Sequence, residues 1–417
     1  MDKLIIKGGK KLKGGIEISG AKNAALPVMA SSILASGASI VSRVPDLRDV
    51  KTMGRLLSNM GAEFHYEKNR AVILSEKIKN FEAPYELVKE MRASVLVLGP
   101  MLARFGRAKV SLPGGCAIGA RPINLHLMGL EKMGAKIELE AGYVRATAKR
   151  LKGTSIYFDI STVTGTENIM MAATLAKGVT VLENAAREPE VMDLANALIS
   201  MGAKIKGAGE SVIEIEGVDE LSPVRHTVIP DRIEAGTFIA VAGITGGDIT
   251  IRGCMLEHLH AFILKLEEAG LKFEKTADGV RVSGPARPKA ADIETAPYPG
   301  FPTDMQAQFM ALMSIANGTS LITESIFENR FMHVAELMRM GADISFKGST
   351  ATVKGIKKLK GANVMATDLR ASASLIVAAL KAEGITTLHR LYHLDRGYEK
   401  IEEKLNKLGA DIRREKR

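Results

Sequence analysis

The chain has 417 residues, 46% hydrophobic and 25% charged, which is enough for two or three domains with real cores. Its two cysteines exclude a disulfide framework, and no apolar run reaches the roughly 18 residues of a membrane span. The net charge of +10 is compatible with anionic small molecules, whereas 5% aromatic residues and no Trp argue against nucleic-acid binding. Since the N-terminus has no signal-peptide core, we expect a soluble, cytoplasmic protein without nucleic-acid or membrane partners.

A motif in which an amphipathic run ends at a glycine recurs along the chain. Its glycines are Gly61, Gly134, Gly202, Gly270, Gly341 and Gly409. Each precedes a β-rich segment, as a glycine at the C-terminal end of a helix does. A second series ends small, apolar runs and comprises Gly37, Gly106, Gly178, Gly247, Gly318 and Gly384. Each copy of about 70 residues is therefore predicted to contain a buried helix, a strand, a loop, an outer helix and a strand pair.

Six copies predict where the domains begin and end. The copies start near Lys22, Arg92, Thr162, Asp231, Asp304 and Asp368. The sixth is short at the C-terminus, so strands at 4–6 and 16–18 are predicted to complete it. We thus expect an α/β protein with three copies in each of two domains, residues 22–229 and residues 1–21 plus 230–417. Two chain crossings would let the domains open and close over a ligand.

Unusual polar residues gather at the start of each buried helix and in the loop before each outer helix. A helix start attracts anions through its free N–H groups and partial positive charge. Thr162, Asp231 and Asp368 would serve equally well as ordinary N-caps. Several unpaired cations in one cleft would imply bound anions. If the two ends face each other, the residues that converge are Lys22, Arg92, Cys116, Arg121, Asp304 and Arg396.

The segment 113–126, Pro-Gly-Gly-Cys-Ala-Ile-Gly-Ala-Arg-Pro-Ile-Asn-Leu-His, carries the most distinctive chemistry. Paired glycines permit a sharp turn that exposes the thiol of Cys116. Arg121 offers a planar fork for phosphate or carboxylate, and Pro122 suits the first turn of the helical run at 127–133. Cys116 is the candidate acid and Asp304 the candidate base, although an exposed turn with an incidental cysteine stays open.

Other reaction classes lack their motifs. The chain has no dinucleotide-binding glycine pattern after a first strand, no Walker A loop and no Gly-x-Ser-x-Gly sequence. His258 and His260 are two residues apart, which is not the spacing of a helical zinc pair. We expect neither a metal nor a cofactor.

Together these motifs resemble the UDP-N-acetylglucosamine 1-carboxyvinyltransferase family over essentially the whole chain. The resemblance rests on Lys22-Asn23, the Cys116 loop, and residues 301–306, 327–333 and 368–373. It implies an inside-out α/β barrel in each domain. It also implies transfer of the enolpyruvyl group of phosphoenolpyruvate to the 3-hydroxyl of UDP-N-acetylglucosamine, with release of phosphate. That reaction is the first committed step of peptidoglycan synthesis.

The resemblance assigns the cationic residues to the two substrates. Lys22 would hold phosphoenolpyruvate, and Asn23 beside it would contact the sugar nucleotide or the intermediate. Arg121 and Arg396 would bind the phosphate and carboxylate of phosphoenolpyruvate. Arg92 would contact the region of the sugar nucleotide.

The resemblance also assigns the proton transfers. Cys116 would protonate the methylene carbon or assist product release, and would be alkylated by the epoxide fosfomycin. Asp304 would accept the proton of the sugar hydroxyl. The other residues expected to bind substrate are Pro122, Ile123, Asn124, Leu125, Thr162, Val163, Thr164, Ile326, Asp368 and Arg370.

Two positions depart from the family pattern. Asn124 stands where an acidic residue is common near the uracil, and Ile160 stands where a lysine is common near the diphosphate. Two alternatives also stay open. The sister synthase that uses shikimate 3-phosphate shares the fold but typically lacks the loop cysteine. A non-catalytic regulator or RNA-binding protein on this fold is disfavoured by the intact set of charged residues.

Overall fold

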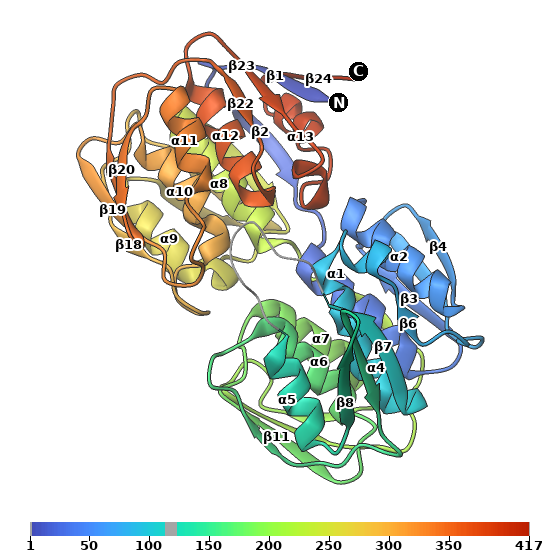
Figure 1. Cartoon of the computed structure of the whole chain (residues 1–417). Helices are drawn as coiled ribbons and strands as arrows, with labels where there is room; N and C mark the ends of the chain where they lie inside the picture. The colour runs from blue at the N-terminus through green and yellow to red at the C-terminus, as the bar shows by residue number, and fades with distance from the viewer. Residues whose placement is uncertain (1, 113–122, 417) are drawn as a thin grey trace. The chain divides into compact units, whose positions relative to one another are not determined.

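The computed structural model describes residues 2–112 and 123–416, so Cys116, Arg121 and Pro122 lie outside the described residues. The chain forms two compact units (Figure 1). We call residues 20–229 the continuous unit, and residues 1–19 together with 230–417 the discontinuous unit. Each unit contains three of the six copies, and each four-stranded sheet combines three strands of one copy with a short strand of another.

Three sheets belong to the continuous unit, and each begins with a short strand parallel to its neighbour. In sheet order they are β14 (Arg225–Thr227), β3 (Ala38–Ser42), β5 (Arg70–Leu74) and β4 (Glu63–Glu67); β6 (Glu82–Ala83), β7 (Arg107–Ser111), β9 (Tyr143–Thr147) and β8 (Lys136–Glu140); and β10 (Ser155–Tyr157), β11 (Val179–Glu183), β13 (Val212–Glu216) and β12 (Lys204–Lys206).

The discontinuous unit repeats this arrangement. In sheet order its strands are β16 (Lys272–Thr276), β17 (Gly279–Ser283), β15 (Asp248–Arg252) and β2 (Lys13–Glu17); β18 (Ile293–Glu294), β19 (Thr319–Thr323), β21 (Thr350–Lys354) and β20 (Asp343–Lys347); and β22 (Asn363–Met365), β23 (Ile385–His389), β1 (Lys3–Lys7) and β24 (Asp411–Glu415).

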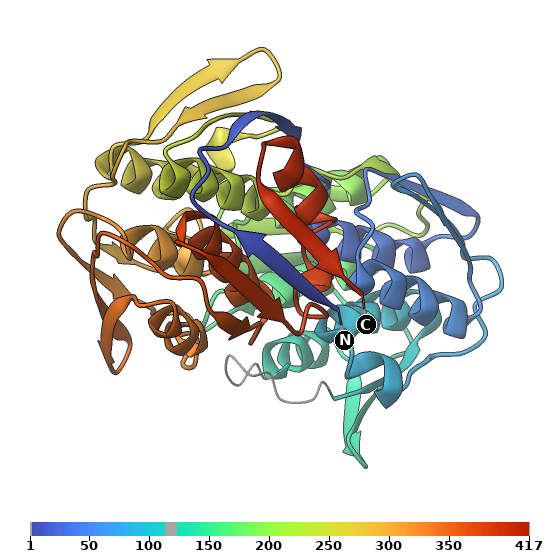
Figure 2. The same ribbon diagram turned by 90° about the horizontal axis from the view of Figure 1, so that it is seen from above.

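The N-terminal strand β1 completes the sixth copy, as predicted. It lies antiparallel between β23 and β24, with Ile5 opposite Thr387 and Arg413. Figure 2 shows this blue strand among the red C-terminal strands. The second N-terminal strand, β2, also belongs to the sixth copy, as its short last strand, although it pairs with β15 of the fourth copy rather than with β1. The short strand of each copy pairs with the first strand of the next copy, so β2 closes the ring of three within its unit, as β14 does on β3.

Six apolar helices form the interior of the two units, which confirms their predicted burial. They are α1 (Lys22–Ser31), α4 (Leu98–Phe105) and α6 (Val163–Ala173) in the continuous unit, and α8 (Arg232–Thr245), α10 (Gln306–Met313) and α12 (Leu369–Lys381) in the discontinuous unit. In the discontinuous unit α12 packs against both α8 and α10, as Figure 1 shows. Within the described residues the sheets are separate, so packing of the buried helices rather than a continuous strand ladder joins the three copies of each unit.

The outer helices end as predicted. They are α2 (Arg48–Met60), α5 (Asn124–Lys132), α7 (Pro189–Ser200), α9 (His260–Glu268), α11 (Met332–Arg339) and α13 (Ile401–Lys407). The glycine that follows each one has φ between 92° and 106°, a conformation that favours glycine over other residues. Helix α5 begins at Asn124, three residues before the predicted run.

Short helices complete the fold. They are η1 (Ser32–Leu34), α3 (Tyr85–Val88), η2 (Arg92–Val97), η3 (Leu256–Leu259), η4 (Thr303–Met305) and η5 (Leu394–Arg396). Among the helices described, none combines the length and apolar character that a membrane crossing requires.

Candidate active site

Three of the six buried helices are capped by the side chain of the residue that precedes them. Thr162 Oγ1 accepts a hydrogen bond from the backbone N–H of Gly165 at 3.3 Å. Asp231 Oδ1 accepts from the N–H groups two and three residues later in α8, at 2.8 and 3.0 Å. Asp368 Oδ1 does the same in α12, at 2.7 and 3.0 Å. The N-cap interpretation of these three positions is confirmed.

The other three copies place a charged residue just after the N-cap position and form no such cap. Lys22 is the first residue of α1, Arg92 opens η2, and Asp304 lies in η4 at the entrance to α10. No side-chain cap is formed at the start of any of these helices. Their side chains are therefore available for interactions beyond their own helix end.

Lys22 has a buried side chain whose Nζ lies 3.4 Å from Asp49 Oδ2. Asp49 belongs to the first turn of α2, where a carboxylate is favoured by the helix dipole. The predicted loop Arg48-Asp49 is thus the beginning of a helix. Asn23, the next residue after Lys22, is exposed. The start of α1 therefore presents a buried ammonium held by a buried acid, with an exposed amide beside it.

A hydrogen-bonded chain connects the start of α5 to the start of α6. The side-chain amide of Asn168 lies 2.9 Å from His126 Nδ1 and also donates to the carbonyl of Val95 at 3.1 Å. Because Asn168 donates, Nδ1 is an acceptor and the proton of the neutral ring is on Nε2. That nitrogen lies 3.3 Å from Thr164 Oγ1. His126 therefore fixes the orientation of Thr164, one of the residues predicted to bind substrate.

His126 stays neutral for two physical reasons. Burial lowers its pKa to about 4, and the positive charge of Arg92 lowers it in the same direction. The sequence placed His126 at the end of the cysteine loop but gave it no role. Its partner Asn168 was missed because it sits in an otherwise apolar helix, where sequence gives no sign of a polar contact.

A pocket of about 450 Å³ lies beside the first turn of α5. Its walls are Asn124, Leu125, Leu127, Met128, Glu131, Ile137, Leu139 and Asp159. The pocket thus combines apolar walls with an amide and two carboxyl groups. Ile123 is buried at the N-cap position of α5, and Ile160, which follows Asp159, is 72% exposed. Thr162, Val163 and Thr164 occupy the N-cap and first turn of α6.

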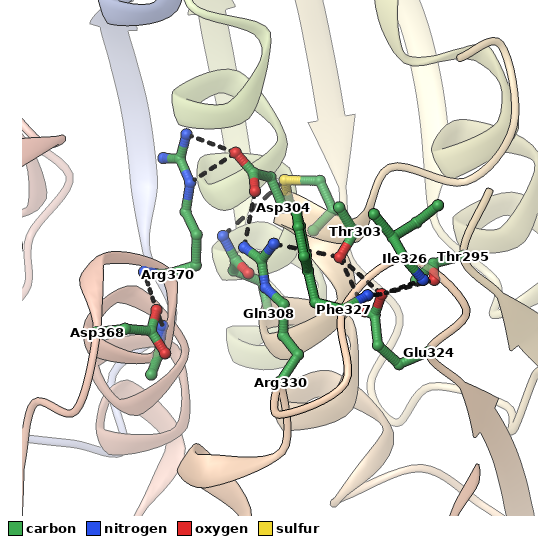
Figure 3. Close-up of polar contacts among 12 residues, drawn as sticks. Thr295, Thr303, Asp304, Gln308, Glu324, Ile326, Phe327, Arg330, Asp368 and Arg370 are labelled. Carbon is green, nitrogen blue, oxygen red and sulfur yellow. Dashed lines mark hydrogen bonds and ion pairs between the residues drawn. The ribbon is translucent and has the colours of Figure 1, made fainter. Parts of the chain in front are cut away.

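In the discontinuous unit, Asp304 is held between two arginines (Figure 3). Arg330 Nη2 donates to Asp304 Oδ1 at 2.7 Å, and Arg370 contacts Oδ2 through Nε and Nη2 at 3.1 and 3.0 Å. The arginine side chains are 4% and 5% exposed, whereas that of Asp304 is 27% exposed. Asp304 therefore has a fixed orientation and keeps some access to solvent. Arg330 belonged to a motif of the sequence but was given no role.

Arg370 is further supported by a buried polar group. Tyr398 lies beneath it, with the guanidinium carbon 5.7 Å from the ring centroid. The hydroxyl of Tyr398 contacts Thr237 Oγ1 at 2.9 Å and accepts from Gln308 at 3.2 Å. Burial alone would lower the pKa of Arg370, but the carboxylate of Asp304 outweighs it, with help from Tyr398 and Asp231, and raises that pKa. Arg370 is a permanent cation beside Asp304.

Two further residues predicted for the site belong to this unit: Ile326, in the segment after β19, and Arg396, in η5. Ile326 follows β19 and donates its backbone N–H to Glu324 Oε1 at 3.0 Å. Arg396 ends η5, close to His393, whose pKa is lowered by burial and by Arg396 and Arg390. Within the described parts of the chain, no three His, Cys, Asp or Glu side chains gather as a set of metal ligands.

Comparison with known proteins decides the family. The EPSP synthase (3-phosphoshikimate 1-carboxyvinyltransferase) family matches residues 6–405. A UDP-N-acetylglucosamine 1-carboxyvinyltransferase of Thermodesulfovibrio yellowstonii is 65% identical over 99% of this chain and 100% of its own length. The protein of the same name from Geobacter metallireducens is 64% identical over the full length of both chains. The chain belongs to the UDP-N-acetylglucosamine 1-carboxyvinyltransferase family.

Solved structures agree with this family on the fold. The enolpyruvyl transferase NikO from Streptomyces tendae superposes with a TM-score of 0.89 at 28% identity, covering 99% of both chains. EPSP synthase from Acinetobacter baumannii gives a TM-score of 0.77 at 20% identity over the full length of both chains, a likeness of fold alone. Like other UDP-N-acetylglucosamine 1-carboxyvinyltransferases, the chain is an α/β transferase.

Proposed function

We propose that the chain transfers the enolpyruvyl group of phosphoenolpyruvate to the 3-hydroxyl of UDP-N-acetylglucosamine and releases phosphate. The observation that carries this proposal is the 65% identity, without truncation, to a transferase of that name. The reaction would commit the sugar nucleotide to peptidoglycan synthesis. Neither a metal nor another cofactor is required, because fixed cations can stabilise the charges that move during the reaction.

The charges of the described residues suit phosphoenolpyruvate, which carries a phosphate and a carboxylate. Lys22 supplies a buried ammonium at the start of α1, where helix N–H groups also favour anions. Arg396 supplies a guanidinium from η5, and Arg121 is its expected counterpart in the cysteine loop. We propose that these three cations bind the phosphate and carboxylate of phosphoenolpyruvate.

The proposed chemistry is an addition followed by an elimination. The sugar oxygen forms a bond to C2 of phosphoenolpyruvate while its proton passes to Asp304. The methylene C3 gains a proton from Cys116, which gives a tetrahedral intermediate. Return of a proton from C3 to the Cys116 thiolate and cleavage of the bond between C2 and the phosphate oxygen then release phosphate and leave an enolpyruvyl ether. Each half needs an acid and a base at fixed positions.

Support for this role of Asp304 comes from its two arginines, which hold the carboxylate in one direction. A base must point at the proton it accepts, and a carboxylate that rotates freely would lose much of that advantage. Asp368 caps the helix that carries Arg370 and so supports the same geometry.

We propose that the sugar nucleotide contacts the pocket beside α5 and the start of α6. Asn124 and Leu125 line that pocket, and Thr164 is oriented by His126. Asn23, Arg92 and the backbone at Ile326 would complete the contacts. The exposed Ile160 offers no charge to the diphosphate, so this chain would rely on other residues for that group.

A phosphate-release assay with each acceptor tests the proposal. UDP-N-acetylglucosamine should support turnover with phosphoenolpyruvate, whereas shikimate 3-phosphate should not. The reverse result would assign the chain to the sister synthase. Absence of turnover with either acceptor would favour the non-catalytic alternative.

Thiol labelling tests the role of Cys116. We expect fosfomycin to alkylate one thiol per chain and to label nothing in Cys116→Ser. The other cysteine is a suitable internal control, because burial, together with the charge of Glu257, raises the pKa of Cys254 to about 12. Labelling at Cys254 would contradict the assignment.

A further inference from the structure

Glu324 is a buried carboxylate that gathers hydrogen bonds from three segments of the discontinuous unit. Its Oε1 accepts from the backbone N–H groups of Ile326 and Phe327, at 3.0 and 3.1 Å. The same oxygen accepts from Thr295 Oγ1 at 3.0 Å, and Thr303 Oγ1 lies 2.8 Å from Oε2 (Figure 3). Glu324 is only 3% exposed. All four partners are donors, which suits a group that can only accept.

The local backbone differs from that of four other copies at this position, and the second copy, in which Leu112 N–H donates to Gly142, shares it. In four copies the residue after the first strand has a positive φ, between 54° and 74°: Arg43, Asn184, Gly253 and Arg390. Glu324 does not adopt that conformation. Its N–H donates directly to the carbonyl of Ser349 at 2.8 Å, whereas in the first copy Val44, one residue later, makes the matching bond to Asn69. Of the two copies without the left-handed residue, only the fifth has a carboxylate at this position, and that carboxylate is buried.

The hydrogen bonds continue from Glu324 to Asp304. Thr303 Oγ1 donates to Glu324 and accepts from Arg330 Nη1 at 3.2 Å. The other terminal nitrogen of Arg330 holds Asp304 Oδ1 at 2.7 Å. One carboxylate therefore supports two parts of the proposed site at once: the backbone at Ile326 directly, and the Asp304 carboxylate through Thr303 and Arg330.

We propose that Glu324 is a positioning residue. It fixes the position of the Ile326–Phe327 backbone relative to that of the Asp304 carboxylate. The inference rests on the proposed function for its substrates, but its geometry is independent of them. Glu324 touches no reacting atom in this scheme. It acts through Thr303, whose hydroxyl must donate to Glu324 because it accepts from Arg330.

Two substitutions separate the branches of this arrangement. Glu324→Gln keeps one oxygen for the two N–H groups but presents an NH₂ group as a donor toward Thr303. Thr303→Val removes the hydroxyl and leaves the N–H groups of Ile326 and Phe327 bonded to Glu324. Thr303→Ser keeps the hydroxyl, so this variant should have the same hydrogen exchange and kinetics as wild type. The matched control is Glu336→Gln, because Glu336 is also buried and accepts a backbone N–H, from Met365 at 2.9 Å.

Hydrogen exchange tests the geometry without substrates. In Glu324→Ala the amides of residues 326 and 327 should exchange at least about tenfold faster than in wild type, since they lose their acceptor. In Thr303→Val they should stay protected. Unchanged protection in Glu324→Ala would overturn the inference, and this arm remains decisive if wild type proves inactive with the proposed substrates.

Kinetics tests the consequence. Glu324→Gln and Thr303→Val should each lower kcat/KM for the sugar nucleotide about tenfold. The kcat/KM of the double variant should fall little further, because both substitutions break the same hydrogen bond, between Thr303 and Glu324. Thr303→Ser and Glu336→Gln should stay within about twofold of wild type. Multiplicative losses, wild-type kcat/KM in Glu324→Gln, or an equal loss in Glu336→Gln would contradict the positioning role. Failure of wild type to release phosphate would instead contradict the proposed function.

Discussion

The six buried helices begin in two different ways. At Thr162, Asp231 and Asp368 the side chain bonds back to the N–H groups of its own helix. At Lys22, Arg92 and Asp304 no such bond forms. The capping side chains belong to N-cap residues, whereas each charged side chain belongs to a residue inside the first turn. The start of a buried helix therefore serves either to stabilise the helix or to present a charge.

The charged starts differ from one another in their partners. Lys22 is paired with Asp49, from the outer helix of its own copy. Asp304 is paired with Arg330 of its own copy and with Arg370 of the next one. A capped start depends on its own helix alone, whereas a charged start depends on neighbours that are distant in sequence. Substitution should therefore affect the two classes differently.

The largest effect is expected for Asp304→Asn. Loss of the proposed base should lower kcat by roughly 10²–10⁴-fold. The matched control is Asp231→Asn, at the start of the buried helix of the previous copy, where asparagine caps a helix as well as aspartate does. Single-turnover phosphate release measures both. Equal losses in the two variants would remove the distinction between charged and capped starts.

An acid-dependent loss of stability is expected next. The pKa of His126 is about 4 in the folded chain, mainly through burial, against an ordinary value near 6.5. Between these values the unfolded chain binds the additional proton, so the free energy of unfolding falls as pH drops from about 6.5 to about 4, by up to about 3 kcal/mol. Above pH 6.5 this contribution is fully present.

Urea unfolding at a series of pH values measures this contribution. His126→Phe should be less stable than wild type at pH 7, because Asn168 loses an acceptor, but should show a shallower dependence on acid. His65→Phe, at an exposed position, is the control. An unchanged acid dependence in His126→Phe would show that Arg92 and burial do not keep this ring neutral.

A smaller effect is expected for Asp231→Ala. This variant loses the cap of α8 and should be destabilised by about 1 kcal/mol, with kcat within a few-fold of wild type. Thermal and urea unfolding measure the change. A loss of kcat without a loss of stability would place Asp231 with the charged starts.

The smallest effect is expected for Ile160→Lys. A lysine at this exposed position would supply a charge for the diphosphate and should lower KM for the sugar nucleotide by a few-fold. The gain should shrink as salt concentration rises, because exposed charges are screened. Ile160→Gln is the uncharged control. A salt-independent gain would mean that the lysine acts through something other than its charge.

The repeat was readable from the sequence because its signals are local. A glycine at the end of a helix, a helix that is apolar on all sides, and a threonine or aspartate at a helix start each need only near neighbours. For the same reason Thr162, Asp231 and Asp368 were predictable as caps. The place of β1 in the sixth copy also followed, since the C-terminal copy lacked one strand.

Only the tertiary structure decided which distant residues meet. β2 pairs with β15 because the ring of three sheets must close, a constraint that no local pattern expresses. His126, Asn168, Arg330 and Glu324 gain their roles from partners on other elements, across separations in sequence that periodicity does not report. The sequence determined the copies and their caps through interactions within a few residues. Packing determined the charge pairs, because burial makes each ion require a partner wherever the chain can supply one.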